Sequence, residues 1–228
     1  MIFNYLLDDK IYISGGPINN GGAVWKWFVM NFISKDADDK AYAGLMQKVN
    51  EISPGSDGLI FLPYLMGERA PIWDSKACGS FFGINLKHTQ SHFARAVVEG
   101  ISFALYSVCE ALEQASGKIE YIYASGGFVQ SKEWLQIIAD IFNKKVYRQN
   151  TEDASAIGAA LMAIKTMESL PLYPVFKSEE LSELIHPDKN VHRQYQQVYP
   201  FFKRLYIKLK DEMEELFNMK INNDQPSR

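Results

Sequence analysis

The sequence predicts an α/β fold, in which buried strands alternate with amphipathic helices. The clearest sign is a strand-turn-helix unit: apolar residues alternate over 119–124, and Ser125-Gly126-Gly127 then allows a sharp turn. A second sign is the stripe of apolar and small residues over 92–112, which repeats at helical spacing. A third is a helix of small residues that starts at the N-cap residue Asp153 and carries Gly158 among alanines.

The amino-terminal half predicts a strand, two helices and a second strand. A strand at 10–14 is broken by Gly15-Gly16-Pro17, and helices follow over 22–32 and 41–49. A short buried strand at 59–62 comes after a loop at 53–58. The first helix places its buried face on Trp25, Phe28, Val29 and Phe32.

Residues 63–83 show no clear periodicity and are rich in Gly, Pro and aromatic side chains. A long irregular segment inside a compact domain is usually functional. The elements predicted after it are a helix at 92–112, a strand at 119–124, a helix at 132–142, a strand at 145–148 and helices at 154–167 and 192–217. Residues 170–190, with three prolines and an acidic run, predict a linker.

The composition is typical of a globular intracellular protein. Of 228 residues, 47% are hydrophobic and 22% charged, and the net charge of −3 gives no reason to expect nucleic acid or an anionic membrane as partner. No apolar run is long enough to span a bilayer, and the acidic start does not resemble a signal peptide. Cys78 and Cys109 are too few for a disulfide framework, which favours a reducing cytoplasm. We expect no metal site, since the four histidines lack ligand spacing.

Two small-residue surfaces suggest a ligand site. Gly126-Gly127 follows the carboxyl end of a strand, and the helix around Gly158 is lined with alanine and serine. Together these surfaces would form a slot for a flat ligand, and a purine nucleotide is the leading candidate. The alternatives are structural: a Gly-Gly after a strand is most often only a turn, and Gly158 would then serve close helix packing.

Four stretches of the sequence resemble the carboxyl-terminal domain of the FGGY family of carbohydrate kinases. Each stretch alone is only moderately specific for the family, but the four together keep the family's order and spacing over roughly 11–170. The stretches are Gly67-Glu68-Arg69-Ala70-Pro71; Gly79-Ser80-Phe81-Phe82-Gly83-Ile84 with His92-Phe93 and Ala96-Val97-Val98-Glu99; Ser125-Gly126-Gly127 with Trp134 and Ala139-Asp140; and Ala156-Ile157-Gly158-Ala159-Ala160.

Within the family, two stretches are nearer the gluconate and xylulose kinases than the glycerol kinases. Gly22-Ala23-Val24-Trp25-Lys26-Trp27 has that character, and residues 13–22 are most similar to gluconate kinases. The resemblance therefore implies a gluconate kinase, with a xylulose kinase as the alternative.

The resemblance implies an actin-like ATPase fold of the ribonuclease-H type, with a mixed sheet flanked by helices. Family members have two such domains with the active site between them, so this chain resembles only the second. Residues 1–170 would be the nucleotide-binding domain without its first hairpin, 171–217 a linker and packing helix, and 218–228 a disordered tail. The amino-terminal domain would supply the sugar site and the catalytic aspartate.

The resemblance also implies ATP and Mg²⁺ as cofactors. It carries cofactor contacts over to Gly22, Lys26, Gly126, Gly127, Ser131 and Gly158. It places no catalytic residue and no metal ligand in this chain. A full-length kinase would transfer the γ-phosphate to a hydroxyl of a sugar or sugar acid, and this part alone would be inactive or nearly so.

Other interpretations of the chain remain. It could be a non-catalytic, actin-like ATP-binding module, or a pseudo-enzyme kept as a dimerisation partner, and a homodimer fits either. Arg69 is expected either to pair with Glu68 or Asp74 or, less often in such loops, to contact substrate.

Overall fold

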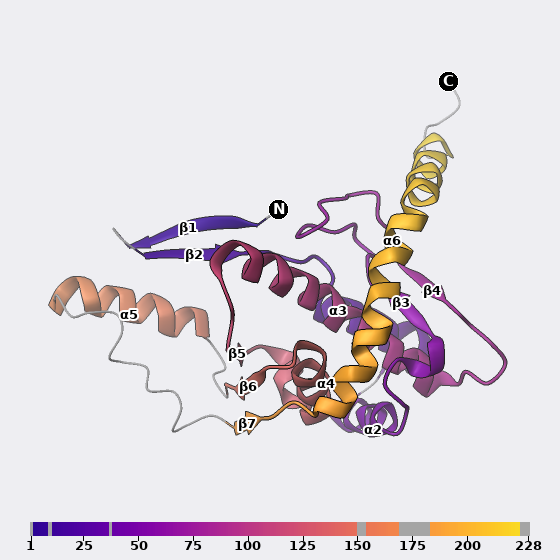
Figure 1. The fold of residues 1–228 in the computed structure, drawn as a ribbon, viewed down its shortest axis with the longest axis horizontal. Coiled ribbons are helices and arrows are strands. Elements are labelled where there is room, and N and C mark those ends of the chain that lie inside the picture. Colours follow the sequence, from indigo (N-terminus) through magenta and orange to yellow (C-terminus); the bar gives the residue numbers. More distant parts are fainter. Residues whose placement is uncertain (1, 9–10, 37, 150–153, 169–182, 224–228) are drawn as a thin grey trace.

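The computed structural model describes residues 2–8, 11–36, 38–149, 154–168 and 183–223 (Figure 1). The helices are α1 (Gly22–Phe28), α2 (Asp39–Asn50), α3 (Gln90–Ser116), α4 (Lys132–Phe142), α5 (Ala154–Glu168) and α6 (Lys189–Asn223). The strands are β1 (Phe3–Asp8), β2 (Ile11–Gly15), β3 (Ile60–Leu62), β4 (Ser80–Phe82), β5 (Tyr121–Ala124), β6 (Lys145–Arg148) and β7 (Glu183–Ile185). A π-helical turn η1 (Val29–Ile33) and two 3-10 turns, η2 (Ser56–Gly58) and η3 (Gly127–Gln130), complete the elements.

The described strands form three small sheets. β1 and β2 are an antiparallel hairpin, and β3 pairs antiparallel with β4. The third sheet is mixed: β5 runs parallel to β6, and β7 pairs antiparallel with β6 on the other side. Helix α4 is the crossover between the parallel strands β5 and β6, as a parallel pair requires. These elements confirm the predicted α/β class with a mixed sheet and flanking helices.

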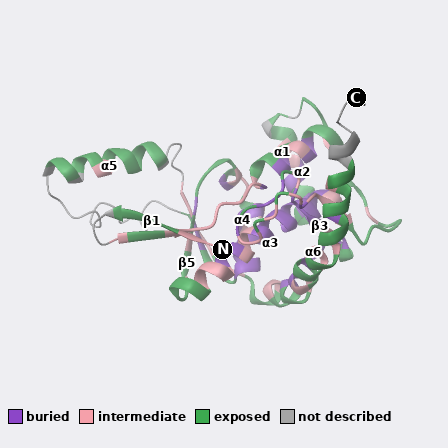
Figure 2. Ribbon diagram, turned by 90° about the horizontal axis from the view of Figure 1, so that it is seen from above, coloured by how far each residue is buried: buried purple, intermediate pink, exposed green. Residues whose placement is uncertain are grey.

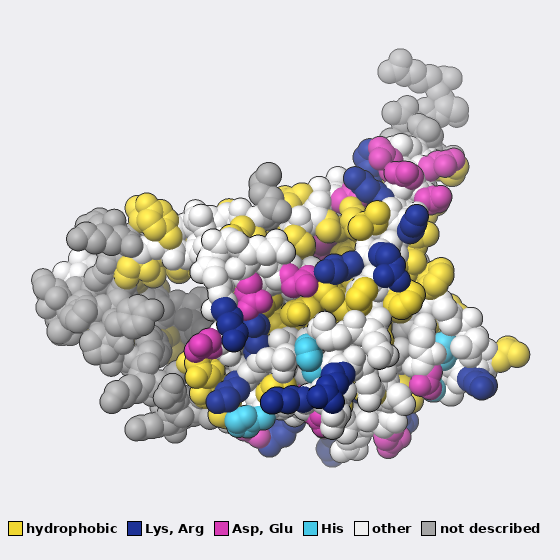
Figure 3. Space-filling model, in the orientation of Figure 1, with side chains coloured by type: hydrophobic (Ala, Val, Ile, Leu, Met, Phe, Trp, Pro, Cys, Tyr) yellow, Lys and Arg dark blue, Asp and Glu magenta, His cyan; other side chains and the backbone are white. Residues whose placement is uncertain are grey.

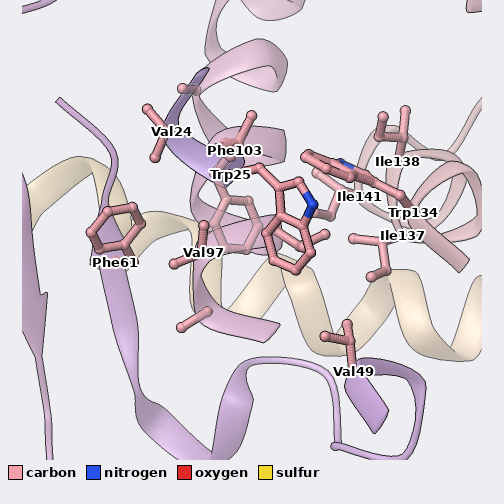
Figure 4. Packing of buried hydrophobic residues seen from close by; sticks show 14 of the residues in the cluster. Val24, Trp25, Val49, Phe61, Val97, Phe103, Trp134, Ile137, Ile138 and Ile141 are labelled. Carbon is pink, nitrogen blue, oxygen red and sulfur yellow. The ribbon is translucent and has the colours of Figure 1, made fainter. Parts of the chain in front are cut away.

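The core lies where α1, α3 and α4 meet. Figure 2 shows the buried residues concentrated in these helices, while α5 and the outer side of α6 are exposed. In the close-up of Figure 4, Trp25 of α1 lies beside Trp134 of α4, with ring centroids 5.6 Å apart in an edge-to-face arrangement. The indole N–H of Trp134 donates to Ser102 Oγ of α3 over 3.2 Å, so this aromatic contact joins all three helices.

Several predicted elements match the structure closely. α4 and β6 have the predicted bounds, and the stripe predicted over 92–112 is the buried face of α3. Four elements differ from the prediction. The strands β1 and β4 were not predicted, and β4 lies in the segment 63–83 that was expected to be irregular. β7 lies inside the predicted linker, and α6 continues to Asn223, into the predicted tail. Most of that linker (169–182) and the end of the tail (224–228) lie outside the described residues, as does the predicted cap Asp153.

The prediction that Phe32 is buried is wrong. Trp25, Phe28 and Val29 are buried as expected, but the Phe32 side chain is exposed. The helix widens into a π turn at Val29–Ile33, where the amide of Ser34 donates to the carbonyl of Val29. A π turn rotates the following side chains off the stripe that a 3.6-residue period predicts.

The strand at 119–124 is less buried than its apolar alternation predicts. Tyr121 and Tyr123 are exposed, and only Ala124 is fully buried. β5 is an edge strand of the sheet in the described chain, and one of its faces is uncovered. Tyr123 instead stacks on Tyr147 of the neighbouring strand β6, with centroids 5.0 Å apart. Such cross-strand aromatic pairs stabilise a half-exposed sheet.

A buried ion pair on α3 joins the core to α6. Arg95 Nε donates to Glu99 Oε1 over 2.7 Å, and the two residues are 4% and 2% exposed. Arg95 Nη2 donates to the hydroxyl of Tyr195 on α6 over 2.6 Å, and that hydroxyl donates to Glu99 Oε1 over 2.9 Å. Burial and the neighbouring Glu99 carboxylate raise the pKa of Tyr195 well above its ordinary value, so the hydroxyl keeps its proton. We refer to Arg95, Glu99 and Tyr195 as the buried triad.

The same carboxylate holds a strained turn. Gly55, Ser56, Asp57 and Gly58 all have positive φ, between 49° and 90°, which non-glycine residues rarely adopt. Glu99 accepts from the amide of Gly55 and from the hydroxyl of Ser56, each over 3.0 Å. Glu99, the last residue of the second stretch that resembles the family, therefore holds this turn in place through two hydrogen bonds.

The Gly-Glu-Arg-x-Pro loop docks the segment that leads into α1. Glu68, 3% exposed, accepts from the amide of Asn19 over 2.6 Å and from Asn20 Nδ2 over 3.0 Å. Asn20, which is fully buried, also donates to the carbonyl of Gly67 over 2.6 Å. The amide of Ala70 donates to the carbonyl of Pro17 over 3.0 Å. These bonds fix where α1 begins.

Asp140 ties α4 to the start of α6. Its carboxylate, on a residue 5% exposed, accepts from the amide of Asp188 over 2.7 Å and from Gln136 Nε2 over 2.8 Å. Its backbone carbonyl also lies 2.8 Å from His192 Nδ1. Burial raises the pKa of Asp140 above its ordinary value, because the charged form loses water.

Among the described residues, no helix combines the length and apolar character needed to cross a bilayer.

Removal of one member of the buried triad should destabilise the domain strongly. Arg95→Met leaves the Glu99 carboxylate buried without its cation, and we expect a loss of about 3–5 kcal/mol in the free energy of unfolding. Lys132→Met, which breaks the exposed Lys132–Glu183 pair, should cost less than about 1 kcal/mol. Urea unfolding curves compare the two, and similar losses would contradict the assigned role of the triad.

Asp140 should make stability depend on pH. Its carboxyl keeps its proton to a higher pH in the folded than in the unfolded chain, so stability falls as the pH rises above the unfolded value of 3.8. Asp140→Asn retains an oxygen acceptor and removes this charge. The free energy of unfolding, variant minus wild type, should therefore be more positive at about pH 7 than at about pH 3.5. Urea unfolding of both proteins at the two pH values measures this difference. The same difference at both pH values would contradict the raised pKa of Asp140.

Candidate functional site

The carboxyl end of β5 opens onto an exposed turn, which we call the glycine shelf (residues 125–131). The chain leaves β5 at Ala124, and Gly126 adopts φ 99° and ψ −177°, a conformation that only glycine adopts readily. The turn η3 follows, and α4 begins after Ser131. Ser125, Gly126 and Gly127 are all exposed, so a ligand can approach the backbone.

Ser131 has a structural role in the described chain. Its hydroxyl accepts from the amide of Trp134 over 3.2 Å, which makes it the N-cap of α4, and it donates to Glu133 Oε2 over 2.8 Å. The predicted nucleotide contact at Ser131 would thus use a hydroxyl that is already held in place by the start of the helix.

The aromatic core brings α1 to the shelf. Phe128 of η3 packs against Trp134 at 5.9 Å between centroids, and Trp134 packs against Trp25 of α1. Gly22 is the first residue of α1, and Lys26 follows Trp25; both are exposed. The predicted contacts at Gly22 and Lys26 thus lie on a helix that packs against the helix following the shelf.

Among the described residues, nothing requires three of the predicted cofactor-binding glycines to be glycine. A glycine is required where φ is positive or where a Cβ would meet a neighbouring atom. Of the fifteen glycines, four have neither a positive φ nor an atom of the described residues within 4 Å of an added Cβ. These four are Gly22, Gly44, Gly127 and Gly158. Three of them, Gly22, Gly127 and Gly158, belong to the predicted cofactor contacts.

The structure does not close the predicted slot. Helix α5 projects away from the body in both views (Figures 1 and 2), and Gly158 is exposed. No neighbouring atom lies within 4 Å of an added Cβ at Gly158, so the close helix packing considered for it is not made by the described residues.

Sequence reasoning missed Arg148, which lies at the same sheet edge as the shelf. It is the last residue of β6 and stands in register with Ala124, the last residue of β5. Its guanidinium donates to Gln130 Oε1 over 3.1 Å and to Glu183 Oε2 over 3.3 Å, while its Nε is buried and has no partner among the described residues. The signal in the sequence was available: the ends of parallel strands meet at one edge, so the basic residue that ends 145–148 belongs beside the turn at 125–127.

Arg69 does not make the predicted pairs with Glu68 or Asp74 through its side chain. Its Nε donates to Asn19 Oδ1 over 2.7 Å and its Nη2 to the carbonyl of Ile18 over 3.2 Å, so it strengthens the loop contact described above. Within the described part of the chain, no group of three or more His, Cys, Asp or Glu side chains is arranged to hold a metal ion.

Comparison with known proteins agrees with this architecture. Residues 6–167 match the model of the FGGY family of carbohydrate kinases, C-terminal domain. The chain is 34% identical to a gluconokinase of Bacillus licheniformis over 95% of its length, and 31% identical to a xylulose kinase of Staphylococcus epidermidis over 96%. It spans 44% and 43% of those two relatives, less than half of each.

Solved structures give the same result. The gluconate kinase from Lactobacillus acidophilus superposes with a TM-score of 0.84 at 32% identity, covering 94% of this chain and 43% of that one. The Plasmodium falciparum glycerol kinase with ADP shares the fold, with a TM-score of 0.70 at 24% identity, covering 87% of this chain and 40% of that one. The domain is thus of the actin-like, ribonuclease-H-like class found in sugar kinases. The chain belongs to the FGGY family of carbohydrate kinases, and it corresponds to the family's C-terminal domain.

The two shelf glycines should respond differently to alanine. Gly126→Ala forces a Cβ into a conformation with φ 99° and should destabilise the domain by about 1–3 kcal/mol. The Cβ that Gly127→Ala adds meets no atom of the described residues, and residue 127 does not have a positive φ. The free energy of unfolding should therefore change by no more than about 0.5 kcal/mol. Thermal and urea unfolding of the two variants test this, and a loss at Gly127 equal to that at Gly126 would contradict the assignment.

Proposed function

We propose that this chain is the nucleotide-binding domain of an ATP-dependent carbohydrate kinase, with gluconate as the first candidate substrate. The observation that carries the proposal is the set of free glycines at Gly22, Gly127 and Gly158, which the packing of the chain does not require. The family membership and the gluconokinase and gluconate kinase relatives support the same reaction class.

In this proposal the shelf binds the nucleotide through its backbone. Because Gly126 and Gly127 carry no side chain and lie exposed after β5, their backbone can approach a phosphate or ribose closely. Ser131 would add a hydroxyl fixed by its cap bond. Lys26 and Arg148 would contribute positive charge, and Arg148 has a buried Nε still without a partner.

Phosphoryl transfer depends on positioning and on neutralising charge, and a carboxylate accepts the proton of the attacking hydroxyl. FGGY kinases use ATP, generally with Mg²⁺. We expect the ion to be held by the ATP phosphates and by groups of the amino-terminal domain, together with the aspartate base and the sugar site. This chain would then supply nucleotide positioning, and by itself it would transfer phosphate slowly or not at all.

A xylulose kinase is the second candidate, because xylulose kinases match this chain at 28–34% identity, beside gluconokinases at 34%. The two share the proposed nucleotide shelf and differ in the sugar, so the shelf does not separate them. The sugar is a property of the whole kinase, of which this chain matches less than half.

Calorimetric titration with Mg-ATP tests the shelf. We expect weak binding by the chain, with a dissociation constant on the order of tens of micromolar to millimolar. Gly127→Val should abolish it, because the added side chain occupies the space of the ligand. Gly44→Val is the matched control: Gly44 is equally free of neighbours but lies in α2, and its variant should bind as the wild type does.

Loss of binding in both valine variants, or in neither, would count against the shelf. Robust sugar-dependent ADP release by this chain alone would count against the expectation that the base lies in the other domain. In the full-length kinase, turnover with gluconate and with xylulose separates the two candidate substrates.

A further inference from the structure

A basic hollow lies at the end of the sheet opposite the glycine shelf. The shelf follows the carboxyl ends of β5 and β6, whereas this hollow of about 460 Å³ lies at their amino ends. Its wall is made by segments far apart in the sequence: the loop after α3, the turn between α4 and β6, and the loop between β7 and α6. It has the size of a site for a small molecule.

The hollow gathers basic side chains from all of these segments. Four are lysines, Lys118, Lys144, Lys145 and Lys189, and the imidazole of His186 lies among them in the lining. Figure 3 shows dark blue and cyan side chains together on this face, over β6, β7 and the start of α6. The chain as a whole carries a net charge of −3, so this concentration of lysine does not follow from its composition.

Acidic side chains neutralise only part of this charge. Lys144 donates to Glu113 Oε1 over 2.6 Å and to the carbonyl of Ile119 over 2.8 Å, so its charge is neutralised and its side chain is held in place within the lining. Among the described residues that line the hollow, Glu120 is the one acidic side chain. In the part of the chain that the structure describes, no ion pair engages Lys118, Lys145 or Lys189.

The rest of the lining is apolar or neutral. Tyr121, with 42% of its surface exposed, lies beside Lys145, whose Nζ is 5.8 Å from the ring centroid. Pro187 and Ile119 complete this side of the hollow. Three ammonium groups without an ion pair among the described residues, one of them beside an aromatic ring, suit a ligand with a phosphate group and a small ring or chain. A phosphate offers several acceptor oxygens to such point charges.

We propose that this hollow binds a small phosphorylated molecule at a site separate from the nucleotide shelf. The two sites stand at opposite ends of β5, with Tyr121 beginning the strand in the hollow and Ala124 ending it at the shelf. The proposal does not rest on the proposed kinase function, since none of the hollow residues belongs to the shelf.

Titration with inorganic pyrophosphate tests the proposal. Wild type should bind with a dissociation constant below about 1 mM at low salt, and more weakly as salt rises. The triple variant Lys118→Gln, Lys145→Gln, Lys189→Gln should lose at least about tenfold in affinity. A control triple variant, Lys48→Gln, Lys87→Gln, Lys208→Gln, makes the same change in net charge at exposed lysines elsewhere and should stay within about twofold.

The variant Gly127→Val separates the hollow from the shelf, because it should retain pyrophosphate binding while losing ATP. If the triple variant does not fold, the single charge reversal Lys145→Glu should give the same loss. The proposal fails if wild type does not saturate by about 10 mM, if both triple variants weaken equally, or if only Gly127→Val loses pyrophosphate. Tighter binding of a hexa-aspartate peptide than of pyrophosphate would also overturn it, since the hollow would then suit an acidic protein surface.

Discussion

The buried carboxylate of Glu99 sets constraints on most of the domain. It neutralises Arg95 one turn earlier on α3, accepts from Tyr195 on α6, and holds the strained turn at Gly55 and Ser56. A charge buried to this extent must have all its partners in place, because an unpaired one is costly. The long helix α3, the packing of α6 and the loop before β3 are therefore fixed relative to one another.

A similar arrangement positions the amino-terminal elements. The carboxylate of Glu68 and the amide of Asn20 are buried against each other, and they fix the segment that enters α1. Trp25 then packs on Trp134, whose indole is held by Ser102 of α3. The first two of the four stretches that resemble the family are thus largely structural, because Glu68 and Glu99 within them fix the elements around the shelf.

The three-stranded sheet separates two kinds of surface. At the carboxyl ends of β5 and β6 lie exposed glycines, the N-cap Ser131 and Arg148, which we propose to bind a nucleotide. At the amino ends lie the lysines of the basic hollow. Because α4 connects the two strands and packs in the core, a ligand at either end would contact segments joined to the same helix.

The sequence by itself determined the local structure and the glycine positions. The bounds of α4 and β6, the buried stripe of α3 and the turn at Gly126 follow from periodicity and from backbone freedom, which are properties of neighbouring residues. The tertiary structure decided which residues meet. It exposed Phe32 through a π turn, placed Arg148 beside the shelf, left α5 projecting and gathered four lysines at one hollow. These outcomes depend on strand order and on contacts between distant segments, which a pattern of adjacent residues does not encode.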